Sequence, residues 1–242
     1  MNSKRSLVLV SLLGVSLPAF AGDLNNIAAL AQNEFRLLSE DLGSALSYKP
    51  LTPTTPLGLT GFDLGLAVTS TKLQNKAAFT TATAGAGDLS NIIVPSLRLH
   101  KGLPFGIDVG IMYSAVPSTN IKLVGGEVRY AIVSGGVATP AIGIRGSYTK
   151  LGGVDELEFN TRSVDLSISK GFVIFTPYAG IGKVWATSTP VGAAAPVLSK
   201  ESFSVNKTFV GLNMNFGLMN VALEGDKTGD ATTYGAKLGF RF

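Results

Sequence analysis

The sequence predicts an all-β fold, a closed antiparallel transmembrane β-barrel of about ten strands with an N-terminal amphipathic helix. Three observations lead to this prediction. From about residue 58 onwards, nearly every segment alternates apolar and polar residues, and turn residues separate the segments. The chain is 45% hydrophobic and only 15% charged, whereas about 25% charged residues is typical of globular proteins. After residue 22 no run approaches the roughly 18 consecutive apolar residues that a membrane-spanning helix needs, so a membrane protein here has to cross with strands.

The first 21 residues have the pattern of a secretory signal peptide. Lys4 and Arg5 precede an apolar stretch, and Ala19-Phe20-Ala21 gives the small-x-small motif of a cleavage site. We therefore expect export and cleavage after Ala21. The chain has no cysteine, so stability after export has to come from packing and backbone pairing rather than from disulfides.

Residues 22–56 differ from the rest of the chain. Ile27, Leu30, Leu38 and Leu42 follow helical spacing within residues 23–48, which predicts an amphipathic helix. Three prolines, Pro50, Pro53 and Pro56, then predict a stiff connector. We expect this helix on the periplasmic side, where it either plugs the lumen, lies across its mouth or remains loosely attached. Residues 57–242 form the predicted barrel.

The strand segments place apolar residues on one parity and small, polar or charged residues on the other. In "FDLGLAVTST", for example, Phe62, Leu64, Leu66 and Val68 share one face. Two segments deviate from this rule. The parity changes near Gly125-Gly126, which predicts a β-bulge there, and the segment 176–185 leaves a misfit at either Tyr178 or Lys183.

The connections between segments alternate in length, with tight turns at one end of the predicted sheet and longer or more polar loops at the other, among them residues 151–160 and 225–231. In bacterial barrels the tight turns are periplasmic and the strand number is even. This topology places Phe242 at the periplasmic rim and predicts that the last strand pairs with residues 58–71.

The composition of the two faces favours a membrane over a soluble sandwich. The polar face is rich in Gly, Ala, Ser and Asn rather than in Lys and Glu, which fits a narrow lumen. Aromatic residues gather toward both ends of the segments, as two membrane interfaces would select. The predicted interface and assembly residues are Tyr113, Tyr148, Trp185, Tyr234, Phe240 and Phe242.

The C-terminal stretch "TTYGAKLGFRF" resembles the last strand of integral bacterial outer-membrane β-barrel proteins, which ends in Phe and is read by the barrel assembly machinery. The resemblance covers the signal peptide and about residues 57–242. It implies the outer membrane as location, and lipid, lipopolysaccharide and the assembly machinery as partners. It identifies no activity and no cofactor.

The predicted inward face carries a nearly balanced set of charges. We interpret it as an ion-paired lumen of a structural barrel or as the lining of a narrow, porin-like passive channel that the helix could gate. The predicted lumen residues are Asp63, Arg98, His100, Asp108, Glu127, Arg129, Arg145, Asp165, Lys207, Glu224, Lys237 and Arg241.

Two other functions compete with a structural barrel or channel. The loops after Leu73 and Ala186 could bind a partner at the cell surface, as in an adhesin. An outer-membrane hydrolase is disfavoured, because Ser96 lies roughly 13 Å along the strand from His100, the only histidine. Ten-stranded outer-membrane proteases of the omptin family resemble the chain only in strand number. We expect no catalytic residue and no metal site. The net charge of +4 falls to +2 when cleavage removes Lys4 and Arg5, which is too small to favour nucleic acid.

Overall fold

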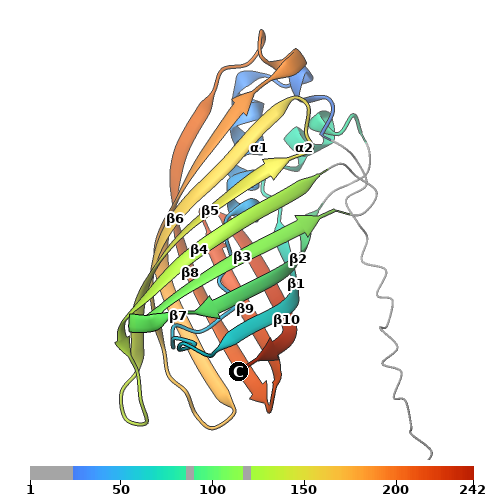
Figure 1. The fold of residues 1–242 in the computed structure, drawn as a ribbon. Helices are drawn as coiled ribbons and strands as arrows, with labels where there is room; N and C mark the ends of the chain where they lie inside the picture. Colours follow the sequence, from blue (N-terminus) through green and yellow to red (C-terminus); the bar gives the residue numbers. More distant parts are fainter. Residues whose placement is uncertain (1–23, 86–89, 117–120) are drawn as a thin grey trace, which may run out of the picture.

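The computed structural model describes residues 24–85, 90–116 and 121–242, and it confirms the predicted architecture. Ten antiparallel strands form a closed barrel in which each strand pairs with its neighbours in sequence and β1 pairs with β10 (Figure 1). The strands are β1 Phe62–Lys72, β2 Asn91–Gly102, β3 Ile107–Ala115, β4 Lys122–Ser134, β5 Ala141–Gly152, β6 Leu157–Ser169, β7 Phe175–Pro190, β8 Glu201–Phe216, β9 Met219–Thr228 and β10 Ala231–Arg241. The predicted signal peptide and its cleavage site lie outside the described residues.

The barrel closes where the sequence predicted, between its first and last strands. β1 pairs with β10 in a continuous register from Asp63↔Arg241 to Thr71↔Thr233. The Phe62 amide donates to the Phe242 carbonyl at 2.9 Å, and the two rings meet edge to face with centroids 4.1 Å apart. The terminal phenylalanine therefore completes the seam.

The two ends of the barrel differ. The turn end, where the C-terminus lies, has the connections 103–106, 135–140, 170–174 and 217–218. The loop end has the connection 73–90 with helix α2 Lys76–Ala82, and the connection 191–200 with the 3-10 helix η3 Gly192–Ala194. The connections 153–156 and 229–230 at this end are shorter than the sequence suggested, because the flanking strands continue further.

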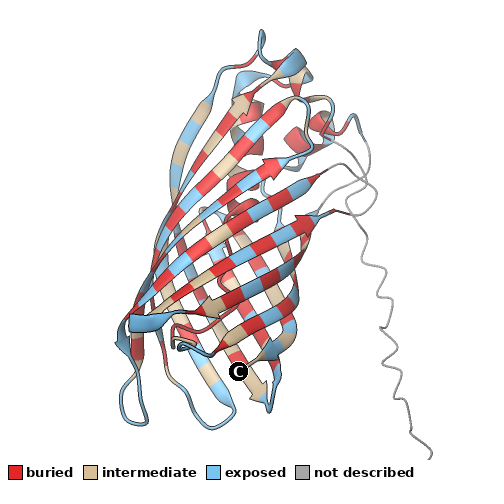
Figure 2. Ribbon diagram, viewed as in Figure 1, coloured by how far each residue is buried: buried red, intermediate tan, exposed pale blue. Residues whose placement is uncertain are grey.

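Buried and exposed residues alternate along the strands, as the bands in Figure 2 show, so successive residues face the lumen and the outside in turn. In β1, Leu64 and Leu66 are exposed on the outside, while Asp63 and Thr69 are buried inside. The ambiguous strand β7 follows the same rule, since Tyr178 is buried and Lys183 is exposed. An exposed apolar exterior around a closed barrel is what a lipid environment requires.

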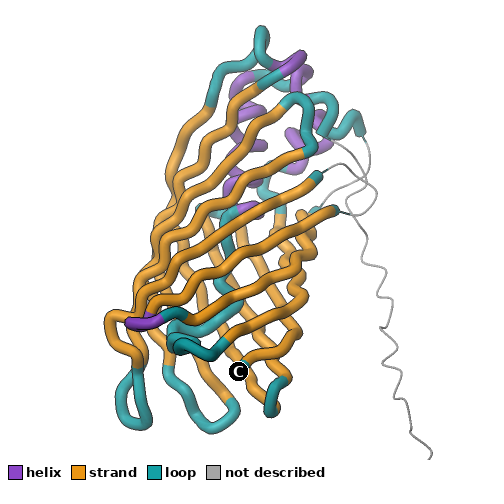
Figure 3. Tube along the Cα trace, viewed as in Figure 1, coloured by secondary structure: helices purple, strands orange, loops and turns teal. Residues whose placement is uncertain are grey.

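The N-terminal helix is shorter than predicted and lies at the loop end of the barrel (Figure 1). A 3-10 turn, η1 Ile27–Ala29, precedes α1 Gln32–Leu46. Leu30 and Ala31 are extended between them, and α1 begins where the Glu34 carboxylate accepts the Ala31 amide at 2.9 Å. The helix lies inside the barrel at the loop end, opposite the C-terminus (Figures 1 and 3). Of the three arrangements considered, the structure shows the helix inside the lumen, although it lies at the loop end and not at the end where the C-terminus lies (Figures 1 and 3).

The connector then runs through the lumen from the end of α1 to the start of β1 (Figure 3). Ser47 is already extended, because the Lys49-Pro50 step disfavours continuing the helix. Residues 41–54 are all buried. The segment re-emerges near residues 57–60, where Leu59 is 65% exposed at the turn end. Residues 24–56 thus fill the barrel along its length.

The interior is apolar at the loop end, which the sequence did not predict. Residues of α1 form one buried cluster with inward-facing side chains of the strands, including Ile92, Leu123, Leu151 and Phe159. The predicted bulge at Gly125-Gly126 is absent, since both registers of β4 run through these residues without a shift. Leu123 faces inward because α1 packs against it, and the register shift in β4 lies between Ala131 and Val133.

Among the described residues, no helix is long and apolar enough to cross a membrane.

Candidate functional site

The lumen of the barrel is the candidate functional site, and all twelve predicted lumen residues face it. Eleven of them are at most 5% exposed, and the side chain of Arg241 is 10% exposed. The structure joins them into ion-paired groups at the turn end and the middle of the lumen. It also adds residues of the N-terminal segment, which the sequence did not assign to this site.

The group at the turn end is centred on Asp63. Its carboxylate lies 2.6 Å from Lys237 Nζ and 3.5 Å from Arg241 Nη1, so the first and last strands are joined by charge as well as by backbone pairing. Asp108 and Arg129 form a second ion pair between β3 and β4. Arg241 also donates to Thr52 of the connector at 3.0 Å, which brings the connector into the group.

The group in the middle of the lumen contains the only histidine. His100 Nε2 lies 3.2 Å from the Tyr48 hydroxyl and 3.5 Å from Glu127. Arg145 Nε lies 2.9 Å from Glu127 and its Nη1 lies 3.7 Å from Asp165. Lys207 lies 3.2 Å from the same aspartate. The neighbours of His100 are therefore a phenol and a carboxylate, and not Ser96, so this geometry does not build a Ser–His pair.

A third group joins the connector to β9. Lys49 Nζ lies 2.6 Å from Asp226 Oδ1, and both side chains are almost fully buried. Lys49 Nζ also donates to the Ser44 carbonyl at 2.8 Å. Neither ion was predicted to lie in the lumen, because Lys49 stands in a proline-rich connector and Asp226 in a stretch that was assigned to a polar loop. The shared parity of Glu224, Asp226 and Thr228 was the available signal.

Charged side chains of the wall also bind the backbone of the connector. Lys207 donates to the Tyr48 carbonyl at 2.8 Å and Arg129 to the Pro53 carbonyl at 2.6 Å. Glu224 accepts the Leu51 amide at 2.8 Å. Prolines prevent the connector from making regular secondary structure, so these contacts satisfy backbone groups that burial would otherwise leave unpaired.

Wall glycines leave room for the connector side chains. A Cβ at Gly125 would lie 3.2 Å from Tyr48 Cδ2, and one at Gly235 would lie 2.9 Å from Leu51 Cδ2. Both distances are shorter than ordinary van der Waals contacts. The wall is therefore shaped to this particular segment as well as charged to match it.

At the loop end the segment is bound to the loops. The Asp41 carboxylate accepts the backbone amides of Gln74 and Asn75, at 3.1 Å and 2.8 Å. Gln32 exchanges hydrogen bonds with the backbone of Ser199. Arg36 lies 3.1 Å from Glu201. These contacts hold α1 in the mouth of the barrel.

The predicted interface residues all point outward. The least exposed of the set is Tyr148 at 42% and the most exposed is Tyr234 at 70%. The set consists of Tyr113, Tyr148, Trp185, Tyr234, Phe240 and Phe242.

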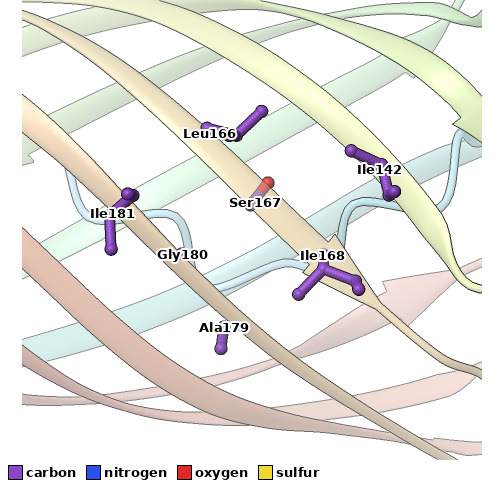
Figure 4. A pocket seen from close by; sticks show the side chains of 7 residues that line it. All are labelled: Ile142, Leu166, Ser167, Ile168, Ala179, Gly180 and Ile181. Carbon is purple, nitrogen blue, oxygen red and sulfur yellow. The ribbon is translucent and has the colours of Figure 1, made fainter.

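The outer wall also carries a shallow apolar groove. Side chains of β5, β6 and β7 line it, among them Ile142, Leu166, Ile168 and Ile181 (Figure 4). Each of these residues has outward parity, so the groove belongs to the lipid-facing surface and not to the lumen.

The closed ten-stranded barrel, its apolar exterior and its ion-paired interior define an integral outer-membrane β-barrel protein. No protein-family model matches the sequence, and no curated protein matches it.

Several solved structures have a similar fold, and they are outer-membrane barrels. The N-terminal β-barrel domain of Pseudomonas aeruginosa OprF shares 14% identity over 76% of this chain and 99% of its own, with a TM-score of 0.37. The outer-membrane protease OmpT from Escherichia coli shares 9% identity over 75% of this chain and 96% of its own, with a TM-score of 0.36. Ail, the attachment invasion locus protein of Yersinia pestis in complex with the heparin analogue sucrose octasulfate, shares 13% identity over 75% of this chain and 97% of its own, with a TM-score of 0.31.

Proposed function

We propose that the protein is a passive channel of the outer membrane that its own N-terminal segment holds closed. The observation that carries this proposal is the unbroken burial of residues 41–54 inside the barrel. A segment that fills the lumen leaves no continuous path for a solute, so transport requires the segment to move. No catalytic role is part of the proposal.

The polar character of the contacts favours a removable plug over a purely structural filling. In the middle of the lumen and toward the turn end, ion pairs and hydrogen bonds hold the connector. Water can replace such contacts once the segment leaves, whereas an apolar wall would resist wetting. Among the described residues, this part of the wall would then present six acidic and six basic side chains to water. The acidic ones are Asp63, Asp108, Glu127, Asp165, Glu224 and Asp226, and the basic ones are Arg98, Arg129, Arg145, Lys207, Lys237 and Arg241.

A disulfide that locks the segment to the wall tests the proposal. Thr54 Oγ1 and Ser167 Oγ are 2.9 Å apart, so cysteines at these positions are within reach of a disulfide, and the chain has no other cysteine. In planar bilayers we expect rare openings of the wild type, no openings of oxidised Thr54→Cys/Ser167→Cys, and recovery after reduction.

A matched control places the disulfide within the wall. Ser147 Oγ and Ser163 Oγ are 2.7 Å apart on β5 and β6, and Ser147→Cys/Ser163→Cys should conduct like the wild type in both redox states. Openings that persist with the segment locked would contradict gating by the segment. A complete lack of openings in the wild type and in a variant with a weakened plug would leave only the structural barrel.

Surface interaction remains the second candidate function because the N-terminal segment orders the loop end. Asn26 donates to the carbonyls of Thr81 and Ala82, and the Ala28 amide donates to Glu156. An ordered loop surface suits recognition of a partner. Loss of cell binding or adhesion after replacement of residues 76–82 and 191–199 would favour this function, and unchanged binding would count against it.

A further inference from the structure

A row of four cations crosses the outer face of the barrel near the loop end. Lys122, Lys150, Arg162 and Lys183 lie on β4, β5, β6 and β7, and all four are exposed on the outward parity. The strand pairs are Lys122↔Gly152, Lys150↔Asn160 and Arg162↔Trp185. Lys150 therefore lies two residues nearer the turn end than Gly152, and Arg162 lies two residues nearer than Asn160. Lys183 lies two residues nearer the turn end than Trp185.

This regular stagger is how a line around a barrel crosses tilted strands. Diagonal neighbours on one face of a sheet lie about 7–8 Å apart, within reach of long side chains. Neighbouring cations of the row are thus spaced so that two of them can hold one anionic group between them.

The row lies at the aromatic belt. Arg162 pairs directly with Tyr148 on one side and with Trp185 on the other, and both aromatic rings are outward and exposed. Tyr and Trp prefer the boundary between hydrocarbon and headgroups. A cation that faces the hydrocarbon midplane destabilises a barrel, and this cost becomes small close to the interface. The row therefore fits the headgroup level of the leaflet at the loop end.

Within the described part of the chain, the row lacks anionic partners. Among residues 24–85, 90–116 and 121–242, no ion pair or hydrogen bond involves the side chains of its four cations. The residues paired with Lys183 are Val164 and Asn206, which carry no charge. Glu158, an outward carboxylate diagonal to Lys150, forms no ion pair with it.

Two other lysines show the contrast at the turn end. Lys101 donates to the Leu59 carbonyl at 2.6 Å, and Lys170 donates to the Val137 carbonyl at 2.6 Å. Those lysines have structural tasks within the protein, whereas the four cations of the row have none.

We propose that this row is a binding site for the phosphate groups of a glycolipid in the outward-facing leaflet, with lipid A, the anchor of lipopolysaccharide, as its occupant. Arginine and lysine are the side chains that bind phosphate, and the aromatic and apolar residues around them suit the acyl chains. The site is independent of the lumen, so it holds whether or not the barrel conducts.

The test uses the full chain in detergent micelles and measures lipid A retained by native mass spectrometry. We expect the wild type to bind diphosphorylated lipid A and to bind its dephosphorylated form much more weakly. The variant Lys150→Gln/Arg162→Gln/Lys183→Gln should bind about 100-fold more weakly, since each interfacial cation contributes about one fivefold step in affinity. Heat-modifiable migration in gels checks that each variant is folded.

Two further variants keep the proposal open to refutation if the triple variant folds poorly. Lys227→Gln removes an exposed outward cation on β9 that lies outside the row, and it should bind lipid A like the wild type. Glu158→Gln removes the acidic neighbour and should bind severalfold more tightly. Three results would overturn the proposal. They are equal binding of the dephosphorylated lipid, unchanged lipid A binding by the triple variant, and a loss of lipid A affinity in Lys227→Gln as large as that expected for one cation of the row.

Discussion

The two halves of the N-terminal segment occupy the same lumen by different means. The helical half, residues 24–46, packs apolar side chains such as Phe35 and Leu38 into a buried cluster with the strands. The connector half, residues 47–57, is held by ion pairs and by wall side chains that bind its backbone. The first half is packed like the core of a soluble domain, and the second half is held like a bound peptide.

This difference indicates where the plug can open. Separating packed apolar side chains exposes them to water, which costs about 25 cal/mol per Å², whereas exchange of polar contacts for water is nearly balanced in free energy. The connector half should therefore move first, and a continuous path opens only when the helical half then leaves the loop end.

The largest expected effect comes from Lys49→Met in the connector half. It leaves Asp226 buried without its cation, which costs about 3–5 kcal/mol when one partner of a buried pair is removed. We expect frequent channel openings in planar bilayers. Lys49→Met/Asp226→Leu should restore much of the closure, because a buried pair replaced by apolar side chains is often neutral. Openings as frequent in the double variant as in the single one would contradict this role of the pair.

Leu38→Ala in the helical half should cost about 3 kcal/mol of docking free energy, since this side chain is fully buried. The comparison predicts a different outcome from that of Lys49→Met. Proteases should cut residues 24–46 more readily, while the connector keeps the barrel closed. Frequent openings with unchanged protease resistance would show that the helical half, and not the connector half, controls opening.

Gly235→Ala should have an intermediate effect, because its new Cβ would lie 2.9 Å from Leu51 Cδ2. Overpacking of this kind costs about 1–3 kcal/mol, and the connector should loosen. Gly146→Ala is the matched control, since nothing lies within 4 Å of its Cβ position. The rate of cysteine labelling at position 52, in a Thr52→Cys background, measures how far the connector has loosened. Equal labelling in both variants would count against a wall whose glycines leave room for the connector.

Arg36→Ala should have the smallest effect. Arg36 pairs with Glu40 and Glu201, but its side chain is 38% exposed. Exposed ion pairs contribute about 0–1 kcal/mol and are screened by salt. Thermal unfolding followed by gel migration should change little, and a loss comparable to that of Leu38→Ala would show that the loop-end contacts matter more than the apolar cluster.

The sequence alone predicted the barrel because strand alternation is a local property. The outward Leu64 and Leu66, the inward Asp63 and Lys237, and the pairing of the last strand with the first all follow from parity. The inward charges could be assigned for the same reason. The bounds of β5 and β6 were less accurate, since Leu151 and Leu157 continue the strands into a stretch that was assigned to a loop.

The place of the N-terminal segment could not be predicted in the same way. An amphipathic stripe specifies that a helix is covered, but not at which mouth of a barrel. Leu123 and Phe159 look like errors in an otherwise polar inward face, until the helix that covers them is known. The Lys49–Asp226 pair spans 177 residues, and no local pattern marks two such ions as partners.

Disulfide mapping of Thr54→Cys/Ser167→Cys in protein assembled in cells tests most directly whether the N-terminal segment passes through the lumen. The account predicts one cross-linked peptide pair that joins the connector to β6, formed as completely as the wall pair Ser147→Cys/Ser163→Cys. Efficient formation of the wall disulfide, with both cysteines at 54 and 167 remaining free, would contradict the account.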